Sequence, residues 1–341
     1  MNVRTGTHLL LIACLHAFGC TPLVTEPRPD IPAVPDESTV LLELGGESES
    51  TSTMGLELSA LVGDASTIGK LTNTTILGTN TELRENLRLI KAISETPVES
   101  YDNGVWNWSF EQDDLSYDFS ITTEPGEDTY GYLLLASKDS APFRETFSGT
   151  MTFFQSRLGA QQGFGTLKFV FDDSNPRSTR GAANVSFRRR GGVRQVNVGL
   201  TNFRIKPATE EPRNAIYSYL HFPDRRGRFM YQTKTDAFGE AESTIGVDVA
   251  FTAFGSGRGI ALLPPKENVE NERVMIEECW DPMLSVTFQT STPEIPRFVD
   301  GERKSCPESL ANIELRPPTE VISDPNDVRT PLPEKHPLEE D

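Results

Sequence analysis

The chain has 341 residues and a formal net charge of −18 at pH 7, with 50 acidic against 32 basic side chains. This excess of negative charge disfavours a nucleic-acid partner, and it disfavours binding to anionic headgroups through bulk electrostatics. Only four histidines and four cysteines are present, which is too few for a His-rich metal site, and we expect no cofactor.

The first 19 residues have the layout of a secretory signal peptide. Arg4 and the amino terminus form a basic region, and an apolar region from Leu9 to Phe18 follows it. This apolar region is shorter than the ~20 residues that span a bilayer. Its end, Ala17-Phe18-Gly19-Cys20, resembles the lipobox of bacterial lipoproteins. The resemblance implies that residues 1–19 are removed and that Cys20 becomes a lipidated first residue.

Two other interpretations of the leader stay open. Leu11-Ile12-Ala13-Cys14 fits the lipobox better locally, but cleavage there leaves less than the ~7–15 apolar residues that a signal peptide needs. An ordinary secretory signal with an incidental Cys20 is the second. If Cys20 is lipidated, several acyl chains give a stable membrane anchor. Thr21 is not the Asp that retains lipoproteins at the inner membrane of enteric bacteria, so the resemblance implies the outer membrane.

Two Pro-rich segments flank the rest of the chain. Residues 20–39 and 316–341 combine prolines with acidic side chains and have no periodic apolar pattern. We expect the first to be a disordered tether and the second a disordered acidic tail. Residues 40–315 remain for one β-rich domain, since single all-β domains reach about 200–250 residues.

One helix is predicted near residues 81–94. Thr79-Asn80-Thr81-Glu82 has the form of a capping box. Apolar side chains then recur at helical spacing until Pro97 (Leu83, Leu87, Ile90 and Ile93). We expect this helix to cover one face or one open end of the β domain.

After residue 100 the apolar period changes to two, which predicts about a dozen strands. They correspond to residues 106–111, 115–121, 132–136, 147–153, 167–171, 183–187, 196–200, 216–222, 229–235, 245–253, 259–263, 274–276 and 284–288. Short connections predict an antiparallel meander that curls into a half-barrel, a barrel or a sandwich. A transmembrane barrel is disfavoured because the apolar runs have about five to eight residues, against the ~9–11 required.

The remaining cysteines predict a disulfide bond. Cys14 leaves with the leader and Cys20 is assigned to the lipid, so Cys279 and Cys306 remain as a pair in an oxidising compartment. Such a bond stabilises by roughly 3–4 kcal/mol in the chain-entropy model. Zinc is not expected, because no further Cys or His lies at ligand spacing.

The layout as a whole resembles the uncharacterised lipobox-bearing lipoproteins of myxobacteria-like Gram-negative bacteria. The shared order is a lipobox, a Pro-rich tether, one helix, a first strand with Trp106 and Trp108, a long meander and a late Cys279-Trp280-Asp281. The resemblance spans most of the chain. It implies the fold and an outer-membrane location, and it is silent on chemistry.

Catalytic signals are weak. His221 is the single histidine outside the leader and the tail. The acidic doublets point to opposite faces of any strand, so none is itself a glycosidase pair (Asp113-Asp114, Asp172-Asp173 and Glu277-Glu278). The run from Gly63 to Lys70 imitates a phosphate-binding loop but has five residues between its glycines instead of four.

A cationic stretch runs from Arg188 to Arg228. It is interpreted either as solvated hairpin turns or as a surface for lipopolysaccharide phosphates or an acidic partner.

The sequence therefore predicts a non-catalytic, lipid-anchored envelope protein with a structural or binding role, attached to the membrane and to an unknown envelope component. One alternative is a carrier whose half-barrel shelters a lipid, with Trp106 and Trp108 facing the ligand. The other is a glycan hydrolase whose two carboxylates come from separate strands.

Overall fold

The structure is a computed structural model that describes residues 30–43, 62–112, 114–123, 128–139, 141–154, 162–172, 179–204, 212–235, 237–238, 243–264, 273–295, 299–311 and 313–317. Two units are distinguished, residues 1–32 and 33–341. The second contains every helix and strand given below. The predicted leader, Cys20 and most of the predicted acidic tail lie outside the described residues.

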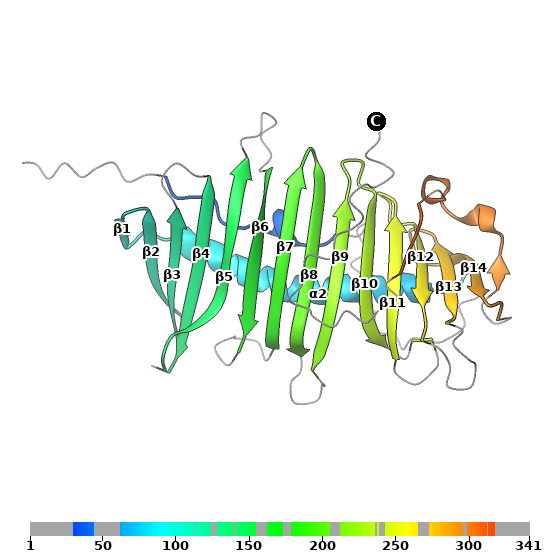
Figure 1. Ribbon diagram of the computed structural model, residues 1–341, viewed down its shortest axis with the longest axis horizontal. Coiled ribbons are helices and arrows are strands. Elements are labelled where there is room, and N and C mark those ends of the chain that lie inside the picture. The colour runs from blue at the N-terminus through cyan, green and yellow to red at the C-terminus, as the bar shows by residue number, and fades with distance from the viewer. Residues whose placement is uncertain are drawn as a thin grey trace, which may run out of the picture. The chain divides into compact units, whose positions relative to one another are not determined.

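Fifteen strands form one antiparallel sheet in sequence order, with β1 and β15 at its two open edges (Figure 1). The strands are β1 Ser100–Asp102, β2 Val105–Gln112, β3 Leu115–Thr123, β4 Thr129–Lys138, β5 Arg144–Phe154, β6 Gln162–Phe171, β7 Arg180–Arg190, β8 Val193–Arg204, β9 Arg213–His221, β10 Gly227–Thr235, β11 Ser243–Phe251, β12 Gly257–Leu262, β13 Met275–Trp280, β14 Val286–Thr292 and β15 Asp300–Gly301. The predicted all-β meander is confirmed. Several strands are longer than their apolar runs, and β8 reaches 12 residues.

The helices are α1 Glu37–Val40, α2 Thr67–Ser94, and the short 3₁₀ helices η2 Arg303–Ser305 and η3 Glu308–Leu310. Helix α2 begins well before the predicted start at residue 81, which was wrong. Its N-cap is Ser66, whose side chain accepts a hydrogen bond from the Gly69 N–H. The apparent capping box lies inside the helix, where Thr79 Oγ1 donates to the Thr75 carbonyl at 2.9 Å. The polar residues of that box make helical and tertiary contacts instead of starting a helix.

Helix α2 crosses one face of the sheet, here named the helix face, at a steep angle to the strands (Figure 1). Its first turn is bonded to β13 through the Ile68 N–H and Glu278, and the Trp108 indole of β2 donates to the Thr96 carbonyl just beyond its last turn. The 28-residue helix is roughly 42 Å long, whereas the strand steps from β2 to β13 would cover about 53 Å in a flat sheet. The sheet must therefore curve around the helix.

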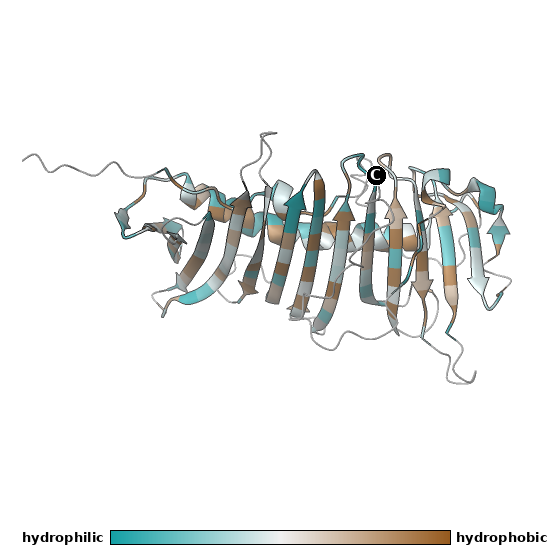
Figure 2. Cartoon of the chain, turned by 45° about the horizontal axis from the view of Figure 1, so that its top comes forward, coloured by the Kyte–Doolittle hydropathy of each residue, from teal (hydrophilic) through white to brown (hydrophobic). Residues whose placement is uncertain are grey.

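Alternation along the strands fills the helix face with apolar side chains. Cross-strand register places one residue of each strand in a continuous row beneath α2. That row is Trp106, Ile121, Tyr132, Gly149, Leu167, Val185, Val198, Tyr217, Tyr231, Val247, Ala261 and Ile276. Apolar and polar bands accordingly alternate along the strands in Figure 2. Most of the large core side chains belong to this row or to the rows next to it.

The opposite side, named the outer face, differs along the sheet. Over β10 to β13 it is covered by residues 306–317, named the C-terminal segment, which contributes Leu310, Ile313 and Leu315 to a small cluster with Ala250 and Ile260. The predicted disulfide between Cys279 and Cys306 is confirmed, with an S–S distance of 2.07 Å. It ties the start of the C-terminal segment to β13.

Within the described residues, no helix combines the length and the apolar character needed to cross a membrane.

Candidate functional site: a clasp around the N-terminal segment

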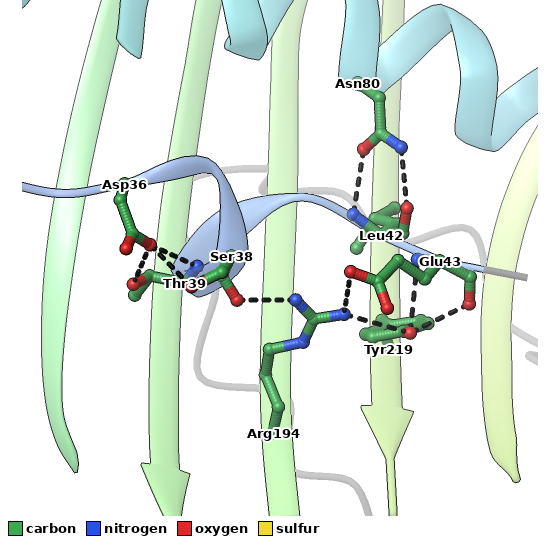
Figure 3. A network of polar contacts seen from close by, with 8 residues as sticks. All are labelled: Asp36, Ser38, Thr39, Leu42, Glu43, Asn80, Arg194 and Tyr219. Carbon is green, nitrogen blue, oxygen red and sulfur yellow. Dashed lines mark hydrogen bonds and ion pairs between the residues drawn. The ribbon is translucent and has the colours of Figure 1, made fainter. Parts of the chain in front are cut away.

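Residues 33–43, named the N-terminal segment, lie on the helix face beside α2 (Figure 1). Three consecutive side chains of this segment are buried, with Val40, Leu41 and Leu42 at 0%, 5% and 2% exposure. The single turn of α1 forms because Asp36 caps it, accepting a hydrogen bond from the Thr39 N–H at 2.9 Å. Four hydrogen bonds and one ion pair then fix Leu42 and Glu43, in the extended part that follows α1 (Figure 3).

Two side chains bind the backbone of this segment from opposite sides. Asn80 of α2 accepts from the Leu42 N–H at 2.8 Å and donates to the Leu42 carbonyl at 2.6 Å. The Tyr219 hydroxyl of β9 accepts from the Glu43 N–H at 3.1 Å and donates to the Glu43 carbonyl at 2.8 Å. Each pair satisfies a peptide donor and acceptor that would otherwise be costly to bury. These four hydrogen bonds recognise the backbone of Leu42 and Glu43 and do not depend on the identities of the two side chains.

Arg194 of β8 connects α1 to the last residue of the segment, Glu43. Its Nη1 donates to the Ser38 carbonyl at 2.6 Å, and its Nη2 donates to the Tyr219 hydroxyl at 3.3 Å (Figure 3). The same Nη2 lies 3.5 Å from the Glu43 carboxylate. The guanidinium is 5.4 Å from the Tyr219 ring centroid, within range of a cation–π interaction. We name Asn80, Arg194 and Tyr219 the clasp.

A second contact fixes α1 against α2. The Glu37 carboxylate pairs with Arg84 at 3.0 Å and with Arg88 at 2.8 Å. The three side chains are about two-fifths exposed or more, so each pair contributes little free energy. Their effect is to set the register of α1 along the helix.

The electrostatics of the clasp favour hydrogen bonding over proton transfer. Burial raises the pKa of Tyr219 to about 12, with the Arg194 charge acting in the opposite direction. His221 stacks on the Tyr219 ring at 6.0 Å, and burial together with Arg194 lowers its pKa. Both groups are therefore neutral at pH 7. The arrangement can hold a peptide segment in place.

A second buried polar cluster joins the start of α2 to β13. The Glu278 side chain is inaccessible and accepts hydrogen bonds from Ser66 Oγ at 2.7 Å, the Ile68 N–H at 2.9 Å and Gln289 Nε2 at 2.9 Å. Burial raises the pKa of Glu278, and these donors oppose the shift. The carboxyl thus occupies the electropositive N-terminus of α2.

Close approach at this point depends on glycine. A Cβ at Gly259 of β12 would lie 2.6 Å from Ile68, so only glycine lets the first turn of α2 reach the sheet. The run from Gly63 to Lys70 that imitates a phosphate-binding loop is this helix start. Two of its donors, the Ser66 hydroxyl and the Ile68 N–H, bind the carboxyl of Glu278 from within the same chain.

The two tryptophans of β2 that the carrier alternative places against a ligand lie in the core. Trp106 and Trp108 are buried, at 3% and 2% exposure, the arrangement that a core role requires. Trp108 donates to the Thr96 carbonyl at 3.1 Å, and Trp106 lies 4.9 Å from the Tyr101 ring. Among the residues that the structure describes, none forms a hydrogen bond with the indole N–H of Trp106.

The acidic doublet Glu277-Glu278 has one member on each face, as the alternation predicts: Glu278 on the helix face and Glu277 paired with Arg258 on the outer face. Asp113 and Asp173 lie outside the described residues. Among the parts of the chain that the structure describes, no group of three or more His, Cys, Asp or Glu side chains is arranged to hold a metal ion.

The clasp was not found by sequence reasoning, although one signal was available. Arg194 is in phase with Val196 and Val198, so a cation occupies a position that alternation assigns to the core. A charged residue in an apolar phase indicates a buried partner. Asn80 was assigned to a capping box, and Tyr219 was given no role beyond its place in the predicted strand 216–222.

Comparison with known proteins adds no relative: no family model, no curated protein and no solved structure matches the chain.

Proposed function

We propose that the chain is a non-catalytic, lipid-anchored protein of the bacterial cell envelope, held in the outer membrane by Cys20, that presents its sheet to another envelope component. The proposal joins the leader and lipobox-like end of the sequence to the way in which the N-terminal segment is held. It requires a lipid at the start of the mature chain, a tether, and a firm junction between tether and fold.

The observation that carries the proposal is the clasp. A tethered domain transmits any displacement of its anchor through the residues where the tether enters the fold. Here the buried Leu42 is bound through its backbone by Asn80 from the helix, and the backbone of the exposed Glu43 is bound by Tyr219 from the sheet. Contacts to backbone atoms do not loosen when an exposed side chain changes. Such a junction suits a permanently anchored chain.

The outer face of β3 to β7 supplies the surface for a partner. Most of its exposed central side chains are polar, among them Asp118, Thr150, Thr166 and Lys168, and Leu133 of β4 adds an apolar group at 37% exposure. They form a broad, mainly polar surface on a supported sheet, the composition of a surface that binds a polar partner with modest burial.

The carrier alternative gains less support. The large side chains of the helix face are buried against α2 and the N-terminal segment, including Phe119 at 1% and Phe147, Phe169 and Phe229 at 0% exposure. An acyl chain would have to replace contacts that these elements already make.

The test is fractionation of cells that express the Cys20→Ser protein, with Cys14→Ser as the matched control. We expect the wild type and Cys14→Ser in the outer-membrane fraction, with acyl mass on the first residue of the mature chain. Cys20→Ser should accumulate as precursor or appear in the soluble fraction. Mature Cys20→Ser protein that stays in the outer membrane would overturn the proposal.

A further inference from the structure

Four hairpin connections lie along one edge of the sheet, here named the hairpin edge. They join β7 to β8 (191–192), β9 to β10 (222–226), β11 to β12 (252–256) and β13 to β14 (281–285), and all lie at the top of Figure 1. Register places them together, since Arg194 pairs with His221, Gly227 with Phe251, and Gly257 with Trp280. The turn from β1 to β2 (103–104) lies at the same edge, at the far end of the sheet, whereas the chain passes from β2 to β3 and from β4 to β5 at the opposite edge.

Two large apolar side chains project from this edge. Phe254 is 78% exposed and Met283 is 82% exposed, and the next large apolar side chain in the described part of the chain, Val62, reaches 48%. The two tips are neighbours, because the Trp280 indole below Met283 donates to the Gly255 carbonyl at 3.2 Å. The most exposed apolar groups of the fold are thus gathered at one place.

The tips are held by the turns that carry them. The Thr252 N–H donates to the Ser256 carbonyl at 2.9 Å across the β11–β12 turn. Asp281 Oδ1 accepts from the Met283 N–H at 2.8 Å and from the Ser285 N–H at 2.9 Å in the other. The exposure therefore belongs to a defined backbone and costs free energy in water unless something covers it.

Basic side chains lie on the two neighbouring hairpins of the same edge. Arg225 and Arg190 are exposed at the β9–β10 and β7–β8 connections. Arg226 lies 2.6 Å from Asp224 in its own turn. The cationic stretch seen in the sequence therefore divides: Arg194 and Arg228 are buried with acidic partners, whereas Arg190 and Arg225 point to solvent at the edge.

We propose that the hairpin edge docks onto a lipid surface with anionic headgroups, Phe254 and Met283 entering the interface while Arg190 and Arg225 contact phosphates. Projecting apolar tips beside cations suit a deformable, negatively charged interface better than a preformed protein pocket. The chain's net charge of −18 opposes such contact in general, so the attraction must be local and salt-sensitive. This docking goes beyond the proposed anchor, since it sets the orientation of the sheet at the membrane.

A local reporter tests the proposal. In the Phe254→Trp protein a new indole stands at the tip, whereas the three native tryptophans are at most 3% exposed. The full chain is mixed with vesicles that contain anionic lipid and brominated acyl chains, and the wild-type emission is subtracted. The matched control is Phe143→Trp, since Phe143 is 44% exposed on the opposite edge. Emission without vesicles verifies that the native indoles stay buried.

We expect a blue shift and bromine quenching for Phe254→Trp and neither for Phe143→Trp. Adding Arg225→Gln to the Phe254→Trp protein should lower the apparent affinity for anionic vesicles about fivefold, and high salt or zwitterionic vesicles should have a similar effect. Absence of quenching at position 254, equal quenching at both positions, or equal quenching with zwitterionic lipid would overturn the proposal. Because the signal is local to the tip, it is independent of whether Cys20 carries a lipid.

Discussion

The two ends of the sheet use their outer faces in opposite ways. Over β3 to β7 the outer side chains meet water, and the ion pair of Lys168 with Glu145 is largely exposed. Over β10 to β13 the C-terminal segment covers the same face. There the pair of Arg228 with Asp248 is buried, at 5% and 0% side-chain exposure. The pattern of alternating residues is similar at both ends, yet the environments differ.

Alternation assigns a side chain to one face of the sheet, but it does not indicate whether solvent reaches that face. A buried ion pair loses its hydration and is tolerated only when further hydrogen bonds complete it. The C-terminal segment supplies these hydrogen bonds to two buried pairs. In the pair of Arg228 with Asp248, the carboxylate accepts from the Arg316 N–H at 2.6 Å. In the pair of Arg258 with Glu277, Arg258 Nη1 donates to the Ile313 carbonyl at 2.9 Å. The covering segment and the buried charges therefore depend on each other.

The largest expected effect comes from breaking a buried pair. Asp248→Asn should reduce the free energy of unfolding by about 3–5 kcal/mol, because it leaves the Arg228 guanidinium buried without its counter-charge. The matched change at the open end, Lys168→Gln, should cost no more than ~1 kcal/mol. Urea unfolding of both variants measures the difference. Similar losses would mean that the two outer faces do not differ.

A smaller effect concerns the helix face of the covered end. Glu278→Gln replaces one carboxyl oxygen by an amide N–H₂ group, which cannot accept hydrogen bonds from the Ser66 hydroxyl and the Ile68 N–H. This loss should reduce the free energy of unfolding by about 1–3 kcal/mol. The pKa of Glu278 is raised in the folded state. Its contribution to stability is therefore complete below the unfolded pKa and declines as pH rises through the folded pKa. The stability difference between wild type and Glu278→Gln should shrink from acidic to neutral pH.

Glu145→Gln at the open end provides the control of opposite sign. The pKa of Glu145 is lowered, mainly by the hydrogen bond from Lys168. Its small contribution is present above the unfolded pKa and is lost as pH falls through the folded pKa. The stability difference for Glu145→Gln should thus vanish on acidification. A Glu278→Gln difference that grows with pH would contradict the assignment of a buried, raised-pKa carboxyl.

Much of the fold could be predicted because its signals are local. Period-two alternation located β2 to β14, and short connections implied sequential antiparallel pairing. The disulfide between Cys279 and Cys306 followed from counting cysteines. The helix start did not follow, because the Thr79–Glu82 signal has the form of a cap while Ser66 performs that function.

The phase of Arg194 indicated a buried partner, but the contacts of the clasp could not be predicted, because they join distant positions. Tyr219 binds residue 43 across a separation of 176 residues, and Asn80 binds residue 42 across 38. Nothing in the local sequence of either residue distinguishes it from a core tyrosine or a helix cap. The covering of the outer face by residues 306–317 is equally non-local.

The accessibility of the outer face to a thiol reagent can be compared directly between the two ends of the sheet. Thr166→Cys places a thiol on the exposed outer face of β6, and Ala250→Cys places one on the outer face of β11, beneath the C-terminal segment. Maleimide labelling of the folded proteins should be rapid for Thr166→Cys, near the rate of the unfolded chain. For Ala250→Cys it should proceed only through opening of the structure. Equal labelling rates in folded protein would contradict the claim that the C-terminal segment closes one end of the sheet and leaves the other free for a partner.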